Sequence, residues 1–206
     1  MVKTMRKKAR NTHVLIAVGL LALGLTAVLE WTHPTGQPIH WVIRGLALLG
    51  YQFVFLSILS SASLPQLVRF FGRPFIKVHH GLSITGLALI TLHPLAVALS
   101  SGTPLVFLPR FDSLRVFLTL GGRPAWYLIA AATLAAVLRQ PIGKSWKLLH
   151  FLNYLAFFLS TAHANLIGTN FQDLPVRVVS IGMALVVGAV FVRRRWPSAR
   201  RRARAS

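Results

Sequence analysis

Residues 76–99 read IKVHHGLSITGLALITLHPLAVAL, an apolar run that contains His79, His80 and His93. A helix that crosses a bilayer needs about 20 predominantly apolar residues. Because an α-helix rises about 1.5 Å per residue, positions 79 and 93 would be separated by roughly 20 Å along its axis. The run therefore predicts a membrane-spanning helix with a histidine near each leaflet.

Five further apolar runs surround this segment. The chain of 206 residues is 54% hydrophobic and has a mean hydropathy of +0.62, which is too apolar for the water-facing surface of a soluble protein. Together the runs predict an all-α membrane protein, a bundle of six transmembrane helices within residues 13–192. The other expected spans are residues 13–31, 41–62, 124–138, 146–168 and 176–192.

Positive charge is concentrated at the two ends of the chain. The sequence contains 23 Lys and Arg against 3 Asp and Glu, and residues 1–12 and 193–206 form basic tails. Because Lys and Arg favour the cytoplasmic side, both termini are expected in the cytoplasm, in contact with anionic lipid and not with nucleic acid. The first run lacks a small-residue cleavage pattern, so we expect a retained helix. These features predict a multi-pass protein of a cell membrane of the bacterial inner-membrane type.

Several classes of chemistry are excluded by residue types that the sequence lacks. With no cysteine, it has no disulfide, no thiolate nucleophile and no cysteine-held iron–sulfur cluster. Its acidic residues, Glu30, Asp112 and Asp173, all fall in or beside expected outer loops. No nucleophile stands with a base and an orienting acid, so hydrolytic catalysis has no support. Redox chemistry would need a cofactor of another kind.

The histidines form the informative pattern, because an ionisable group at membrane depth is costly unless it is paired or ligated. His79, His80 and His93 lie on the third expected span, and His150 and His163 lie on the fifth. These spans would run parallel, which pairs His79 or His80 with His150, and His93 with His163. Neutral imidazole binds iron, copper or zinc. Two imidazoles leave four coordination positions that no nearby Cys, Asp or Glu fills, and a haem fills all four.

Helical phase favours His79 over His80 as the partner of His150. At about 100° per residue, His79 lies about 40° from the side of the helix that carries His93, whereas His80 lies about 140° away. The same rule puts His150 and His163 about 140° out of phase, so an ideal helix does not describe the fifth span. His80 therefore stays an alternative to His79.

Four motifs carry a resemblance to a known family. They are His79-His80-Gly81, Thr91-Leu92-His93-Pro94, the run from Trp146 to Tyr154 and the run from His163 to Thr169. In these motifs the chain resembles the ferric reductase-like transmembrane domain family. That family includes ferric reductases, NADPH oxidases and the haem-binding subunit of the bacterial methionine sulfoxide reductase system. The resemblance covers all six expected spans and implies b-type haems held by histidines of the third and fifth spans.

The resemblance implies a role in electron transfer. His93 and His163 would hold the iron of an outer haem b, and His150 with His79 or His80 would hold that of an inner one. One or two haems per chain are expected, with two favoured. Electrons would pass outward from a separate cytoplasmic flavoprotein or a quinol to ferric iron, dioxygen or a periplasmic reductase partner. The chain would then be a component of an oxidoreductase, with FAD or FMN present only through a partner or weakly bound.

Three alternatives stay open. The haem-binding subunit of the methionine sulfoxide reductase system is similar in length, but its usual pattern has no histidine at positions 79 and 80. A histidine-lined metal transporter would carry no haem, although such proteins usually need carboxylates within the membrane. In a non-catalytic assembly subunit, the haem would be structural and a physiological donor would not reduce it.

Overall fold

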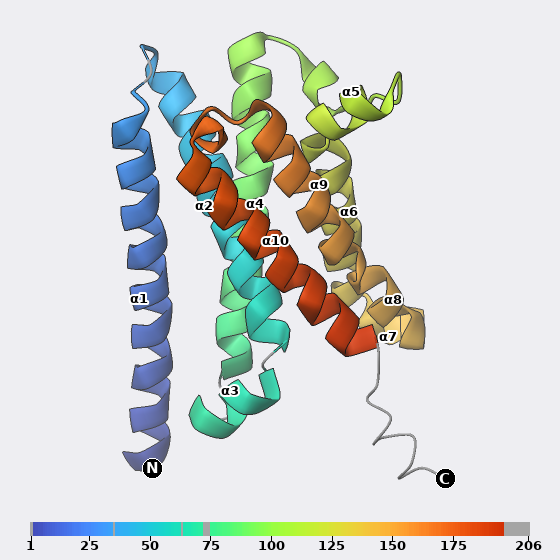
Figure 1. Ribbon diagram of the computed structural model, residues 1–206. Coiled ribbons are helices and arrows are strands. Elements are labelled where there is room, and N and C mark those ends of the chain that lie inside the picture. Colours follow the sequence, from blue (N-terminus) through green and yellow to red (C-terminus); the bar gives the residue numbers. More distant parts are fainter. Residues whose placement is uncertain (1, 35, 63, 72–74, 196–206) are drawn as a thin grey trace.

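Helices joined by short turns make up the described part of the chain, and no strand occurs within it. The computed structural model (Figure 1) describes residues 2–34, 36–62, 64–71 and 75–195. Over these residues the predicted all-α fold is confirmed. The elements are α1 (Val2–Thr32), α2 (Pro38–Ala62), α3 (Leu64–Phe71), α4 (Phe75–Ser101), the 3-10 helix η1 (Pro104–Phe107), α5 (Leu114–Thr119), α6 (Gly122–Val137), α7 (Arg139–Ile142), η2 (Gly143–Ser145), α8 (Trp146–His150), α9 (Leu152–Ile167), η3 (Thr169–Gln172) and α10 (Leu174–Arg195).

Among the described residues, three helices, α2, α4 and α10, are long and apolar enough to cross a membrane. A fourth candidate combines α6 with the residues from Arg139 to Ile167, which are bent by 86° relative to α6. The apolar part of α1, Ala17–Thr32, is shorter. Large apolar side chains are exposed along these helices, among them Leu99 at 83% and Leu185 at 70%. Such extensive apolar surface is typical of contact with lipid, and it supports a membrane protein.

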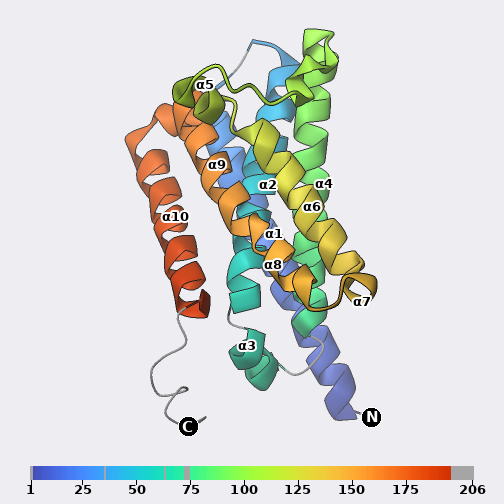
Figure 2. The same ribbon diagram turned by 90° about the vertical axis from the view of Figure 1, so that its right-hand side faces the viewer.

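Successive long helices run in alternating directions along the bundle (Figures 1 and 2). The start of α1 and the end of α10 lie at one end, together with α3 and α7, and we call this the basic end. The opposite end, called the loop end, holds η1, α5 and η3. Within the bundle α2 packs on α4, α6 packs on α9, and α10 contacts both α2 and α9. The outermost helix, α1, packs mainly against α2.

The contact between α2 and α4 depends on two glycines. A Cβ atom added at Gly50 would lie 2.6 Å from Cγ2 of Ile90 and 3.1 Å from its backbone nitrogen. A Cβ atom added at Gly86 would lie 3.2 Å from the backbone nitrogen of Val54. Small residues let membrane helices approach closely and gain van der Waals contact. The two backbones therefore pack here because neither glycine carries a side chain.

The fifth expected span is not one continuous helix, because α8 and α9 meet at a break at Phe151. The N–H group of Phe151 is shared between the carbonyl oxygens of Lys147 and Leu148, at 3.3 and 3.1 Å. A tightened, 3-10-like turn advances about 120° per residue instead of about 100°. Such a turn at Phe151 reduces the phase difference of about 140° expected between His150 and His163 by about 20° for each tightened residue. This accounts in part for a spacing that an ideal helix does not explain.

Two further segments differ from the expected boundaries. Residues 2–12, expected as a basic tail, continue α1. The helix α3 was not predicted; its Leu67 and Val68 pack against the core between α1, α2 and α4. Of the expected C-terminal tail, residues 193–195 belong to α10, and residues 196–206 lie outside the described residues.

Replacing Gly50 by valine should destabilise the bundle, because the added atoms would meet α4. Overpacking of a filled contact typically costs about 1–3 kcal/mol. We expect a lower thermal unfolding midpoint in detergent, measured by fluorescence-detected size exclusion. Gly45→Val is the matched control on the same helix, since a Cβ atom there meets nothing within 4 Å. Equal midpoints for the two variants would contradict the close packing at Gly50.

Candidate functional site

A cavity of about 490 Å³ lies toward the loop end, among α2, α4, α6 and α9. His93 of α4 and His163 of α9 both line it. Most of the other lining side chains are apolar, including Pro94, Trp126 and Phe157. A cavity of this size, with a few polar groups in an apolar wall, is typical of a ligand-binding site. We call it the loop-end cavity.

A second cavity, of about 280 Å³, lies toward the basic end and is lined by His79 of α4 and His150 of α8. We call it the basic-end cavity. His80, the other candidate ligand on α4, is not among its lining residues. Polar side chains are more frequent here than in the loop-end cavity; they include Ser57, Ser61, Ser83, Thr133, Lys147, Asn153 and Arg194.

The two cavities are neighbours within the bundle. Val54 of α2 and Ile129 of α6 line both of them, so one aliphatic partition stands between the cavities. Phe157, buried at 1% exposure, lines the loop-end cavity and stacks on Tyr51 with ring centroids 4.8 Å apart. The bundle thus contains two sites in series along its length, one near each end.

Five histidines line the two cavities, and all of them except His40 share one hydrogen-bond pattern. In each, Nδ1 lies within hydrogen-bond distance of a main-chain carbonyl oxygen. Because a carbonyl only accepts, Nδ1 of His79, His93 and His163 must carry the proton, and Nε2 keeps its lone pair. Nδ1 of His150 lies near both the Ala132 carbonyl oxygen and, at 3.4 Å, the Asn153 amide nitrogen, which can only donate, so its contacts do not set one tautomer. No residue in the described ranges forms a hydrogen bond with these Nε2 atoms. The Nδ1-to-oxygen distances are 3.1 Å from His79 to Ser57, 2.9 Å from His93 to Ile43, 3.3 Å from His150 to Ala132 and 2.6 Å from His163 to Thr119.

This pattern is the one that metal-ligating histidines usually show, in which the second ring nitrogen is fixed by a carbonyl or carboxylate. The partner of His163 has a local explanation. Thr119 is the last residue of α5, and the final carbonyls of a helix have no partner within it. The short helix α5 therefore presents a free acceptor to α9. Ser60 adds a side-chain hydroxyl 3.1 Å from Nδ1 of His79.

Two adjacent glycines let the turn between α5 and α6 approach α9. A Cβ atom at Gly122 would lie 2.9 Å from Cδ2 and 3.0 Å from Nε2 of His163. A Cβ atom at Gly121 would lie 2.9 Å from the carbonyl oxygen of Leu159. Any side chain at Gly122 would therefore disturb the imidazole. Sequence reasoning missed both positions, and the Gly-Gly pair at the start of an apolar run was the available signal.

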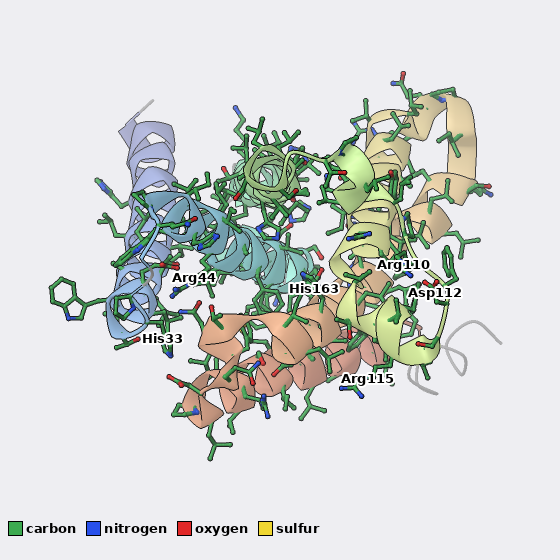
Figure 3. All side chains as sticks on the ribbon, turned by 90° about the horizontal axis from the view of Figure 1, so that it is seen from above. His33, Arg44, Arg110, Asp112, Arg115 and His163 are labelled. Carbon is green, nitrogen blue, oxygen red and sulfur yellow. The ribbon has the colours of Figure 1, made fainter. Side chains whose placement is uncertain are left out.

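A buried polar cluster lies beside the loop-end cavity. Arg44, which lines the cavity, donates through Nε to Oδ1 of Asn170 at 3.0 Å and through Nη1 to the carbonyl oxygen of His33 at 2.6 Å. Its Nη2 lies 3.5 Å from Oε2 of Glu30. Within the described residues, Nη2 and both Glu30 oxygens are buried without a hydrogen-bond partner. Arg44 and His163 are seen from above in Figure 3.

The segment after α4 covers the loop-end cavity. Val106 and Phe107 of η1 contribute to its lining. Arg123 fixes this segment: its Nη1 donates to the carbonyl oxygens of Leu105 at 3.1 Å and Leu108 at 2.8 Å. A single guanidinium therefore holds both ends of the 3-10 turn above the cavity.

The candidate ligands come in pairs. Within the described ranges, no group of three or more His, Asp or Glu side chains is placed to hold a metal ion. Two imidazole nitrogens in one apolar cavity suit an iron whose other four positions are filled by a porphyrin. Paired imidazoles held by main-chain carbonyls are the donor set that a haem iron takes.

The structure places His93 with His163 at one cavity and His79 with His150 at the other, as the predicted pairs. His80 is exposed and lines neither cavity, with its ring centroid 5.8 Å from that of His79. His79 is therefore the one of these two neighbours that faces a cavity. The role of all five as cofactor ligands stays a prediction.

Comparisons of the chain with protein-family models, curated proteins and solved structures found no match. The functional argument rests on the cavities, the hydrogen bonds and the sequence motifs.

Replacing Arg123 by glutamine should loosen the segment above the loop-end cavity, because a hydrogen bond from a charged donor typically contributes about 1.5–3 kcal/mol. We expect amide hydrogen exchange in residues 103–112 to become about tenfold faster, measured by mass spectrometry. Arg115→Gln is the control, since Arg115 is exposed on α5 and is not among the cavity-lining residues. Equal exchange in both variants would show that Arg123 does not hold this segment.

Proposed function

We propose that this chain is a membrane protein that binds two b-type haems and passes electrons across the bilayer, from a cytoplasmic donor to an outer acceptor. The observation that carries the proposal is the shared state of four intramembrane histidines. Each has Nδ1 within hydrogen-bond distance of a main-chain carbonyl oxygen, each has an Nε2 without a hydrogen-bond partner among the described residues, and each lines one of two neighbouring cavities. The motif resemblance to the ferric reductase-like transmembrane domain family supports the same conclusion.

The proposed topology has six spans, with the basic end in the cytoplasm. Three spans are α2, α4 and α10, which meet the length and composition of a spanning helix. The others would be α1, α6, and α8 with α9. Because α6 packs along α9, we treat the two as an antiparallel pair and not as one bent span. Lys and Arg at the basic end favour the cytoplasmic side.

In this proposal the chain's own residues position and insulate the cofactors. His93 and His163 would hold one iron, and His79 and His150 the other. Haem, when bound, supplies one-electron chemistry. The carbonyl contacts orient the imidazoles, and Val54 and Ile129 form an apolar wall between the two sites. Two sites in series would divide a hydrocarbon core about 30 Å thick into shorter steps.

The ligand assignment is tested by counting haem in purified variants. Wild-type protein, expressed with a supply of haem, should show b-type bands in a reduced-minus-oxidised spectrum and about two haems per chain by pyridine haemochrome assay. Each haem needs both of its axial ligands. We therefore expect His93→Ala and His163→Ala to lose the loop-end haem and keep the basic-end haem. We expect His79→Ala and His150→Ala to lose the basic-end haem and keep the loop-end haem. His80→Ala is the matched control and should keep both.

Each outcome separates the alternatives. One haem in the wild type, lost in His93→Ala and kept in His79→Ala, would favour a subunit of the methionine sulfoxide reductase type. Loss of haem in His80→Ala with retention in His79→Ala would reverse the choice between these neighbours. A folded protein without a Soret band would reject the electron-transfer function and favour the transporter alternative.

A further inference from the structure

Acidic and basic side chains are separated along the bundle. All three acidic residues lie toward the loop end, and each lies beside a basic side chain: Glu30 3.5 Å from Arg44, Asp112 2.9 Å from Arg110 and Asp173 3.0 Å from His33. Two hydrogen bonds from Arg110 hold the pKa of Asp112 below its ordinary value, so this exposed carboxylate is ionised and its charge is compensated. The loop end carries five arginines, Arg44, Arg110, Arg115, Arg123 and Arg177, against these three acidic residues, so its excess of positive charge is small.

The basic end has no such compensation. Within the described residues, its cations have no acidic side chain as a partner; they are Arg69, Lys77, Arg139, Lys144, Lys147, Arg193 and Arg194. Arg193 and Arg194 donate to the main-chain carbonyls of Ala62 and Ser61 at the end of α2, which satisfies hydrogen bonds but leaves the positive charge. Unpaired charge of one sign on one surface attracts a partner of the opposite sign.

Two of these cations belong to the wall of the basic-end cavity. Lys147 and Arg194 are exposed to solvent and also line the cavity, so the cavity reaches the surface between them. Lys147 and His150 both lie on the short helix α8, three residues apart, which is roughly 5 Å along a helix axis. A partner seated on Lys147 would therefore sit within about one helical turn of a candidate haem ligand.

We propose that the basic end is the docking surface for a soluble electron-donor protein with an acidic face around its cofactor. This inference rests on the proposed electron-transfer function. One electron would leave the donor's reduced cofactor, and one ferric iron at the basic-end cavity would become ferrous. Complementary charge across a protein interface raises the rate of association more than it raises the affinity. A quinol is uncharged, so it would gain little from these cations.

The position of the charges favours a protein over lipid headgroups. Anionic lipids surround a membrane protein at its perimeter, whereas Lys147 and Arg194 stand at the mouth of a cavity inside the bundle. Lys144, in the turn before α8, is exposed next to this mouth. A docked protein can cover the mouth and its surrounding cations together.

The experiment reverses charge at the mouth and compares it with the same change at the loop end. The test variant is Lys144→Glu, because Lys144 is exposed and does not line the cavity, and the control is Arg115→Glu on exposed α5. Each protein is placed in nanodiscs of phosphatidylcholine, which carry no net lipid charge. Binding of an acidic flavodoxin is measured by interferometry, and haem reduction by the reduced flavodoxin is followed by stopped-flow absorbance, with uncharged duroquinol as the reference donor.

We expect the flavodoxin affinity of the test variant and its second-order rate constant for haem reduction each to fall about tenfold at low salt. Both losses should become smaller as the salt concentration rises. Reduction by duroquinol and all rates of Arg115→Glu should be unchanged. Arg139→Glu is a second variant, expected to change in the same direction, if Lys144→Glu fails to fold. An equal effect at both ends, or no effect, would overturn the docking surface.

Two further outcomes separate the inferences. An effect that appears only in nanodiscs containing phosphatidylglycerol would assign the basic end to lipid and reject the docking proposal. Flavodoxin binding does not require haem. If the protein holds no haem and the test variant alone loses flavodoxin binding, the docking surface is upheld and the proposed electron-transfer function is rejected.

Discussion

The hydrogen bond from an imidazole Nδ1–H group to a main-chain carbonyl is the interaction on which the interior of this bundle depends. A polar ring inside an apolar bundle is costly without a partner. Four histidines meet this constraint in the same way, with acceptors at Ser57, Ile43, Ala132 and Thr119. Each contact gives one ring nitrogen an acceptor and leaves the other without a hydrogen-bond partner among the described residues, on a residue that lines a cavity. One constraint thus produces both stability and a candidate ligand.

Local irregularities of the backbone supply this geometry. The end of α5 leaves the Thr119 carbonyl free, and Gly121 and Gly122 bring the following turn close enough to α9 for His163 to reach it. The break at Phe151 changes the phase between α8 and α9, so His150 lines the basic-end cavity although an ideal helix would point it elsewhere. Regular helices alone would not align the four rings.

The apolar runs and the histidine pairs could be predicted because they depend on length, composition and spacing along one helix. The ends of α2, α4, α6 and α10 fall within three residues of the expected boundaries for this reason. The carbonyl partners of the histidines could not be predicted from the sequence, since Ile43 and His93 are brought together only by packing of α2 on α4. The same holds for Arg44 and Asn170, which are 126 residues apart. Helix α3 and the break at Phe151 depend on tertiary packing, which single-helix periodicity does not report.

The partition formed by Val54 and Ile129 has a consequence for how this chain can change over evolution. Because both side chains belong to the walls of both cavities, a substitution that enlarges one site also reshapes the other. Protein interiors tolerate volume-conserving exchanges far better than additions or deletions of methyl groups. We therefore expect the two sites to change together. Substitutions should accumulate most slowly in the shared wall and most readily in the segment after α4 that covers the loop-end cavity.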